Sequence, residues 1–127
     1  MRLTVEHIAV EPSGITVETR LEPSSARITA QQAQRALELL PNLARHVCVN
    51  DKGETFGAEI SGTEPAHLFE HVVIELMAQE HGGDGAGLMG HTAFTSERGL
   101  METKITFRDD IVALVCIKRA CWFVNEL

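Results

Sequence analysis

The chain has 127 residues, of which 44% are hydrophobic, and a formal net charge of −7. This length suits one domain, and the apolar content is enough for a core, which excludes an intrinsically disordered chain. The acidic balance, without a cluster of lysine and arginine, disfavours nucleic acid as a partner and favours a neutral or cationic ligand. No run of about 18 apolar residues is present, so we expect no transmembrane helix and no membrane partner.

The spacing of the cysteines and the N-terminal residues indicate the cellular compartment of the protein. Cys48, Cys116 and Cys121 are irregularly spaced and do not make a disulfide framework. The N-terminal stretch MRLTVEHIAVEPSG carries acids and alternates in polarity, unlike a signal peptide. We therefore expect a protein of the reducing cytoplasm.

Two β-hairpins are predicted from alternating polarity and turn residues. Residues 2–10 and 15–21 are expected to be strands joined by the turn EPSG. Residues 45–49 and 55–60 are expected to be strands on either side of NDKGE, which forms the second turn.

The segment ITAQQAQRALELLP predicts the first helix. Thr29 and Gln32 have the spacing of a capping box, in which each side chain bonds the other residue's backbone N–H. Alanine and leucine then recur at helical spacing, and Pro41 marks the end of the helix.

A second helix is predicted over residues 64–80. Thr63 is expected to cap it, and Pro65 lies within the first turn, where its missing N–H costs nothing. Gly82 and Gly83 are expected to end it.

The last third of the chain predicts a loop, a strand and a helix. GGDGAGLMG is expected to form the mobile rim of a pocket, and METKITF is expected to be a strand. Asp109 or Asp110 can cap the final helix, whose first half is apolar on nearly all sides. That pattern predicts deep burial or a homodimer face, and Trp122 with Phe123 either joins this face or completes the core.

No internal repeat and no linker is evident. The expected fold is therefore α+β, a single compact domain over residues 1–127 with β-hairpins packed against two or three helices.

The second helix carries the sequence HLFEH, which has the order H-x-x-E-H. His67 and His71 lie one turn apart on one face, as two ligands of one metal must, and Glu70 is offset from both. Zinc peptidases of the inverted-motif type have this order, with the glutamate as general base and the zinc ion activating water. The opposite face is a predicted core stripe made of Leu68, Phe69, Val72, Val73 and Leu76.

The alternative is an ordinary amphipathic helix whose histidines hydrogen-bond to neighbours. Ile74 and Ala78 lie on the histidine side, which indicates that this side faces a second layer or a pocket.

A catalytic zinc ion normally has three protein ligands. Glu75 lies about 12 Å along the helix axis from His67, at 1.5 Å per residue, so both cannot easily reach one ion. We expect Glu75 instead to accept a hydrogen bond from the second ring nitrogen of His71 and so to orient it.

The third ligand is expected from another segment. His46 and Cys48 share one face of the strand predicted over residues 45–49, and His81 and His91 flank the Gly-rich loop. Cys48 is interpreted as a buried structural thiol, since cysteine is among the most buried residues.

Several separate pieces of the chain resemble the N-terminal domain of cyanophycin synthetases. These pieces are Leu40 to Leu43, the His-x-Cys of His46 and Cys48, the pair Gly62 and Thr63, and the helix from His67 to Leu76. The resemblance is clearest over residues 37–80. It is weaker in GAGLMGHT and METKITF.

In that family the domain precedes an ATP-grasp and a Mur-ligase-like domain, which build a polymer of aspartate with arginine side groups. The resemblance implies a domain that holds this polymer and that in some members resembles a metallopeptidase. A chain of this length has no room for the other two domains, so a free-standing relative is expected. It differs from the family at Val49, Asn50 and His91, and the resemblance therefore bears on the metal site more than on the polymer.

The resemblance implies four site residues, His46, His67, Glu70 and His71. The first hypothesis is a hydrolase of amide bonds in a peptide-like substrate, with a divalent metal, expected to be Zn²⁺, on the three histidines and Glu70 as base. Residues 57–60, expected in a strand, would pair with an extended substrate. The alternative is a non-catalytic module of the same fold that binds peptide or polymer or serves in assembly.

Overall fold

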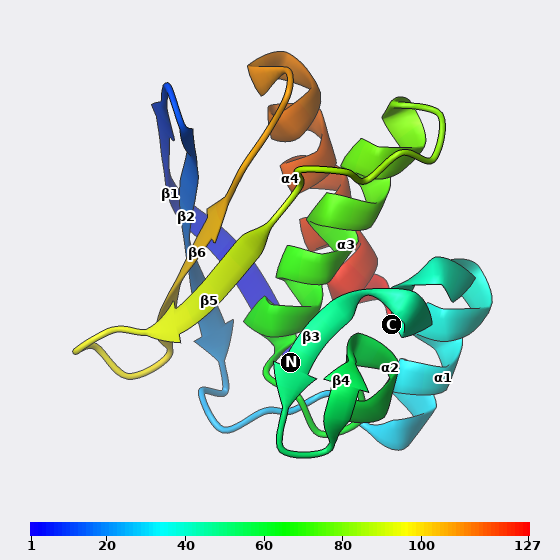
Figure 1. Cartoon of the computed structure of the whole chain (residues 1–127). Coiled ribbons are helices and arrows are strands. Elements are labelled where there is room, and N and C mark those ends of the chain that lie inside the picture. Colours follow the sequence, from blue (N-terminus) through cyan, green and yellow to red (C-terminus); the bar gives the residue numbers. More distant parts are fainter.

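A computed structural model describes residues 1–48 and 51–127 in full and residues 49 and 50 only as part of a strand. It contains a four-stranded sheet, a two-stranded sheet and helices, so the predicted α+β class is confirmed (Figure 1). Among the residues so described, no helix is both long and apolar enough to cross a membrane.

The larger sheet is antiparallel and has the strand order β1-β2-β6-β5. The predicted hairpin is present as β1 (Arg2–Glu11) and β2 (Gly14–Glu22). The strand predicted at METKITF is present as β6 (Leu100–Ile105), and β5 (Gly90–Phe94) pairs with it at the edge. No strand was predicted at β5, because GHTAF has few β-branched residues and follows a glycine-rich loop.

Two long helices, α3 (Pro65–Glu80) and α4 (Asp110–Glu126), cover one face of this sheet (Figure 1). In β2 every second side chain from Ile15 to Leu21 is buried against them, as the alternating pattern requires. The core therefore lies between the sheet and the two helices.

The remaining elements form a second group around the N-terminal half of α3 (Figure 1). They are α1 (Ala30–Leu39), the 3-10 helix η1 (Pro41–Arg45), β3 (Val47–Asn50), β4 (Gly53–Thr55) and α2 (Phe56–Glu59).

The strand predicted over residues 55–60 is wrong beyond Thr55. The chain turns into α2 instead, and the Ile60 N–H donates to the Phe56 carbonyl. Phe56 and Ile60 are both buried, and Gly57 lies against Ala44 so closely that a Cβ would meet the Ala44 carbonyl oxygen at 2.9 Å. These tertiary contacts favour a helical turn, so this segment cannot pair with a substrate as a strand.

Three helix ends agree with the sequence prediction and one departs from it. Thr29 and Gln32 form the predicted capping box, and Asp109 caps α4 by accepting from the Val112 N–H. Helix α3 ends at Glu80 before two left-handed glycines, as expected. Thr63 does not cap α3, which begins at Pro65 with no side-chain cap, because the Thr63 hydroxyl bonds a histidine ring.

Helix α4 is not wholly covered by its own chain. Ala113, Cys116, Ile117, Ala120 and Val124 are buried, as predicted for a core helix. Ile111, Val115 and Trp122 are instead 65%, 52% and 66% exposed. Phe123 packs against the core, so of the two neighbouring aromatics only Trp122 lies outward.

Candidate metal centre

The helix that carries HLFEH is buried on almost every side. Glu70, His71 and Glu75 are 4%, 4% and 5% exposed, so the side opposite the core stripe is not a solvated face. Charged and polar groups at this depth need specific partners, since burial without them costs free energy. The structure supplies partners for each of these groups.

The rings of His67 and His71 face one another through their Nε2 atoms, which lie 3.2 Å apart. The Sγ atom of Cys48, from β3, lies 3.5 Å from the Nε2 of His67. One ligand atom from each of these three residues lies within 4.8 Å of the other two. Cys48, His67 and His71 are therefore called the Cys-His-His cluster.

His67 is held from the side opposite His71. Its Nδ1 lies 2.9 Å from the hydroxyl of Thr63, and the Glu59 carboxylate lies at 3.9 Å. When Nδ1–H donates to the Thr63 hydroxyl, the lone pair of Nε2 points at His71. Thr63 thus orients a ligand atom, which explains why this residue does not cap α3.

A hydrogen-bonded chain holds His71 from its other side. The Nδ1 atoms of His71 and His46 lie 3.0 Å apart, and the Nε2 of His46 lies 3.0 Å from the Oε1 of Glu75. A carboxylate only accepts, so His46 donates from Nε2 and its Nδ1 accepts the proton of His71 Nδ1. This order leaves the Nε2 of His71 with a lone pair directed at His67.

Glu75 remains ionised at the end of this chain. Its carboxylate accepts from the amides of Asn42 and Gln79 as well as from His46. Burial raises the pKa of Glu75, but the hydrogen bonds from Asn42, His46 and Gln79 outweigh it and bring that pKa below its ordinary value. Glu75 was predicted to contact His71 directly, whereas here it acts on His71 only through His46.

His71 is kept neutral. Burial, followed by the charges of His67 and His46, lowers the pKa of His71 to about 3. Phe56 of α2 stacks on the ring with centroids 3.9 Å apart, which fixes its plane. A neutral, immobilised imidazole is the form that binds a metal ion.

Glu70 lies beside the cluster. Its Oε1 accepts from the Thr92 hydroxyl of β5 at 2.7 Å, and its Oε2 lies 3.7 Å from the Nε2 of His71. Burial raises the pKa of Glu70 despite the Thr92 hydrogen bond and the nearby histidines, which lower it. A buried carboxylate with a raised pKa next to a candidate metal position is one that can serve as a general base.

Two of the three ligand-atom separations in the cluster match those expected around one tetrahedral zinc ion, and the third, between Cys48 and His71, is within 4.8 Å. Zn–N bonds of about 2.0–2.1 Å and Zn–S bonds of about 2.3 Å place two nitrogens roughly 3.3 Å apart and a nitrogen and a sulfur roughly 3.5 Å apart. The corresponding distances here are 3.2 Å and 3.5 Å. Two histidines and one cysteine are also a donor set that suits zinc.

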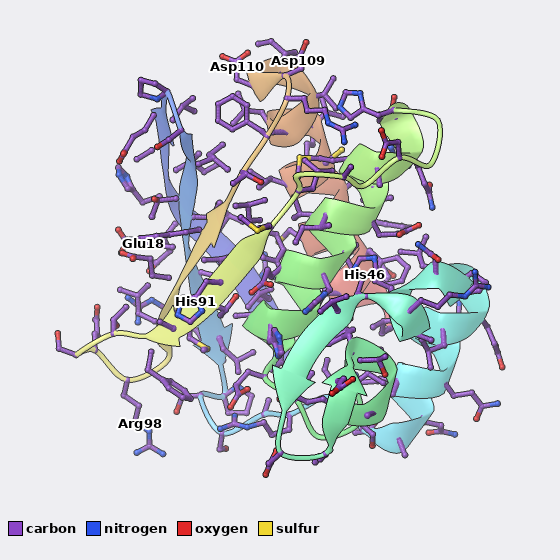
Figure 2. The ribbon with its side chains drawn as sticks, viewed as in Figure 1. Glu18, His46, His91, Arg98, Asp109 and Asp110 are labelled. Carbon is purple, nitrogen blue, oxygen red and sulfur yellow. The ribbon has the colours of Figure 1, made fainter. Side chains whose placement is uncertain are left out.

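The structure distributes the predicted ligand candidates differently from the sequence analysis. Cys48 lies in the cluster and is half-buried, not fully buried as expected. His46 lies beside α3 (Figure 2). It contacts the Nδ1 of His71 and not the Nε2 that faces His67. His81 is the C-cap residue of α3, and His91 is exposed on β5, where Figure 2 labels it. Neither belongs to the cluster.

Two cavities meet over Glu70 and His71. One has a volume of about 450 Å³ and lies between β3 and β5, where Cys48 and His67 form part of its wall. The other, of about 480 Å³, runs toward the C-terminal end of α3 and the glycine-rich loop. The loop therefore borders a cavity as predicted, and Arg108 ties it down by donating to the carbonyls of Asp84 and Ala86.

Sequence reasoning missed Thr63, Thr92, Asn42 and Phe56, which orient the histidines and glutamates. Single threonines, asparagines and phenylalanines carry no periodic signal, so their contacts identify these roles, although Thr63 also belongs to the Gly-Thr pair of the resemblance. Cys48 had such a signal in the His-x-Cys spacing, which places it on the same strand face as His46.

Comparison with protein-family models gives a match over most of the chain. Residues 14–127 match the family model described as the cyanophycin synthase-like N-terminal domain. No match was found among curated proteins.

Proposed function

This chain belongs to the family of cyanophycin synthase-like N-terminal domains, and from that premise we propose that it is a metal-dependent hydrolase of amide bonds in a peptide-like substrate. The observation that carries the proposal is the Cys-His-His cluster with the Glu70 carboxylate 3.7 Å from the Nε2 of His71. Zinc is the metal proposed, on the basis of the donor set and its spacing.

Cys48, His67 and His71 would hold the ion. A zinc ion bound there would lower the pKa of a bound water molecule and polarise the carbonyl group of the substrate. The Oε2 of Glu70 takes a proton from the water molecule as the water oxygen attacks the carbonyl carbon. Glu70 then delivers this proton to the leaving amine nitrogen as the C–N bond breaks, and its carboxylate is restored.

The groups around the reacting atoms have orienting roles. The Thr92 hydroxyl donates a hydrogen bond to the Oε1 of Glu70, and the Oε2 of Glu70 is then directed at the Cys-His-His cluster. His46 and Glu75 hold the Nδ1 side of His71 and so maintain the direction of its Nε2. Such outer hydrogen bonds typically change metal affinity or activity about 10–100-fold.

The charge of the cavities supports a cationic or neutral substrate. Glu59, Glu64 and Glu70 line the cavity between β3 and β5, and no lysine or arginine is among its lining residues. The family description points to cyanophycin, whose arginine side groups carry positive charge. That polymer is therefore the first substrate to test, beside cationic and neutral α-peptides.

The proposal is tested by measuring the metal content of purified protein together with the release of free amines from cyanophycin and from a mixture of peptides. We expect about one zinc ion per chain and hydrolysis that stops when the metal is removed by a chelator and returns with added zinc. A protein that binds no zinc, manganese or similar ion at neutral pH would remove the hydrolase proposal. A protein that holds metal and binds these substrates without cutting them would instead support the binding-module alternative.

A further inference from the structure

One edge of the larger sheet lies open beside the metal centre. The sheet ends at β5, which pairs with β6 on one side, and no strand pairs with its other side in the described part of the chain. An open strand edge presents unpaired N–H and C=O groups to which an extended peptide can add.

The hydrogen-bond register shows which groups of β5 face this edge. The Thr106 N–H donates to the Met89 carbonyl, so this is a hydrogen-bonded pair just before the strand begins. Antiparallel pairs alternate, and the register continues with Gly90 opposite Ile105. The backbone groups of Gly90, Thr92 and Phe94 therefore point to the open edge.

The open edge passes directly over the proposed general base. Gly90 is so close to α3 that a Cβ there would lie 2.8 Å from the Cγ of Glu70. Thr92 bonds the carboxylate of the same residue. A strand added to β5 would lie about 4.8 Å beside it, over the region between Glu70 and β3.

Two neighbouring cavities lie beside β5 and are together called the β5 groove. They share Val47, Glu70, His71 and Gly90, so one extends from Glu70 in each direction. Val47 and Phe94 are 83% and 70% exposed along the β5 groove, which offers apolar contacts to substrate side chains. Exposed apolar side chains in a groove are typical of peptide subsites.

We infer that the substrate is an α-peptide bound in extended form as an added strand on the open edge of β5, with residues on both sides of the bond that is cut. This inference rests on the proposed function for the position of the cut bond. Backbone hydrogen bonds from Gly90, Thr92 and Phe94 hold the peptide, and the β5 groove receives its side chains.

Peptide capture tests the inference without turnover. A randomised library of acetylated, amidated decapeptides is passed over immobilised Glu70→Gln protein, with zinc and with chelator, and retained peptides are identified by mass spectrometry. Each amide of one retained peptide is then methylated in turn. We expect alternate methylations to weaken binding at least tenfold and the intervening ones to have much smaller effects, because alternate amides of an added strand face β5. Equal tolerance at every position, or no retained peptide, would overturn the inference.

A variant of the strand tests the same hydrogen bonds from the protein side. Phe94→Pro removes an N–H that faces the open edge and leaves the ladder to β6 intact, a position where edge strands accept proline. Phe94→Ala is the matched control, because it removes the same side chain and keeps the N–H. We expect Phe94→Pro to bind the retained peptide about five- to tenfold more weakly than Phe94→Ala, as for one lost hydrogen bond. Equal affinity in the two folded variants would contradict the inference, and the methylation scan decides it if Phe94→Pro does not fold.

The two proposals fail in different ways. If the protein holds no metal but captures peptides with the alternating methylation pattern, the hydrolase proposal fails and the added-strand inference stands. If the protein hydrolyses peptides with a bound metal but the methylation pattern is absent, the hydrolase proposal stands and the added-strand inference fails.

Discussion

The Nε2 atoms of His67 and His71 lie 3.2 Å apart, and the Nδ1 of each ring lies within 3.0 Å of a further polar atom. Two imidazole nitrogens at this separation share a proton or a metal ion, because two facing lone pairs repel. A helix face whose histidines only hydrogen-bond to their neighbours, the alternative to a metal site, does not require the two Nε2 atoms to face one another at this distance.

Glu70→Gln separates metal binding from catalysis. Glutamine is nearly isosteric but cannot take a proton from water, and Glu70 is not one of the three residues of the Cys-His-His cluster. We expect unchanged zinc content and a loss of hydrolysis of about 10²–10⁴-fold. Metal analysis and amine release on the same samples check this. A variant that keeps wild-type activity would show that Glu70 is not the base.

Cys48→Ala and His46→Asn distinguish two ligand sets. The cluster contains Cys48, whereas His46 contacts the far nitrogen of His71. We expect Cys48→Ala to lose bound zinc at neutral pH, as His67→Ala and His71→Ala do. His46→Asn should keep one zinc ion with an affinity about 10–100-fold lower. Competition with a zinc-binding dye measures both. The opposite ranking would return His46 to the ligand set predicted from the sequence.

The pKa of His71 gives the metal-free protein a pH-dependent stability. Burial holds this pKa at about 3 in the folded state, below its ordinary value of 6.5. The unfolded chain therefore binds more protons at this residue, so its contribution to stability is complete above about pH 6.5 and is lost as the pH falls toward 3. We expect His71 to account for a loss of about 3 kcal/mol in the free energy of unfolding between pH 7 and pH 4.

Urea unfolding in chelator, with His71→Asn as the non-titrating control, measures this loss. The variant should show a flatter dependence on pH than the wild type. Glu70, whose pKa is raised, contributes in the opposite direction and is present in both proteins. Parallel curves for the two proteins would mean that His71 is not buried in its neutral form.

Gly90→Ala tests the close approach of β5 to Glu70. The new Cβ would lie 2.8 Å from the Cγ of Glu70, so the strand or the glutamate must move. We expect a loss of about 1–3 kcal/mol in the free energy of unfolding and reduced hydrolysis with unchanged zinc content. Gly85→Ala is the control, because its Cβ would meet Ala78 at an ordinary 3.6 Å. Equal stability of the two variants would show that the contact is not tight.

The exposed stripe on α4 predicts self-association. Ile111, Val115 and Trp122 are more than half exposed and lie at helical spacing on one side of α4. We expect a homodimer at high protein concentration and a monomer for Val115→Glu, since a charge opposes burial of the stripe. Sedimentation equilibrium measures both proteins. A wild type that stays monomeric throughout would leave Trp122 as an ordinary surface residue.

Most of the secondary structure follows from the sequence, because its signals are local. The alternation in β1, β2 and β6, the capping box of α1 and the glycines after α3 each involve residues a few positions apart. The histidine pair of α3 is local in the same sense, since helical geometry alone brings residues four apart together.

The rest depends on contacts between distant segments. Strand β5 exists because β6 offers it a partner, and residues 56–60 turn into α2 because Phe56 and Ile60 are buried against other elements. The local sequence pattern of neither segment includes its packing partner. Tertiary packing therefore overrides the intrinsic secondary-structure propensity of both segments.

The candidate metal centre shows the same division. The sequence by itself determined that His67, Glu70 and His71 share one side of a helix, because their spacing sets their directions. Only the tertiary structure decided that Cys48 approaches His67, that His46 lies behind His71, and that Thr92 holds Glu70. These contacts depend on how β3 and β5 pack across α3. A shift of one residue along a strand would turn its side chains to the opposite face.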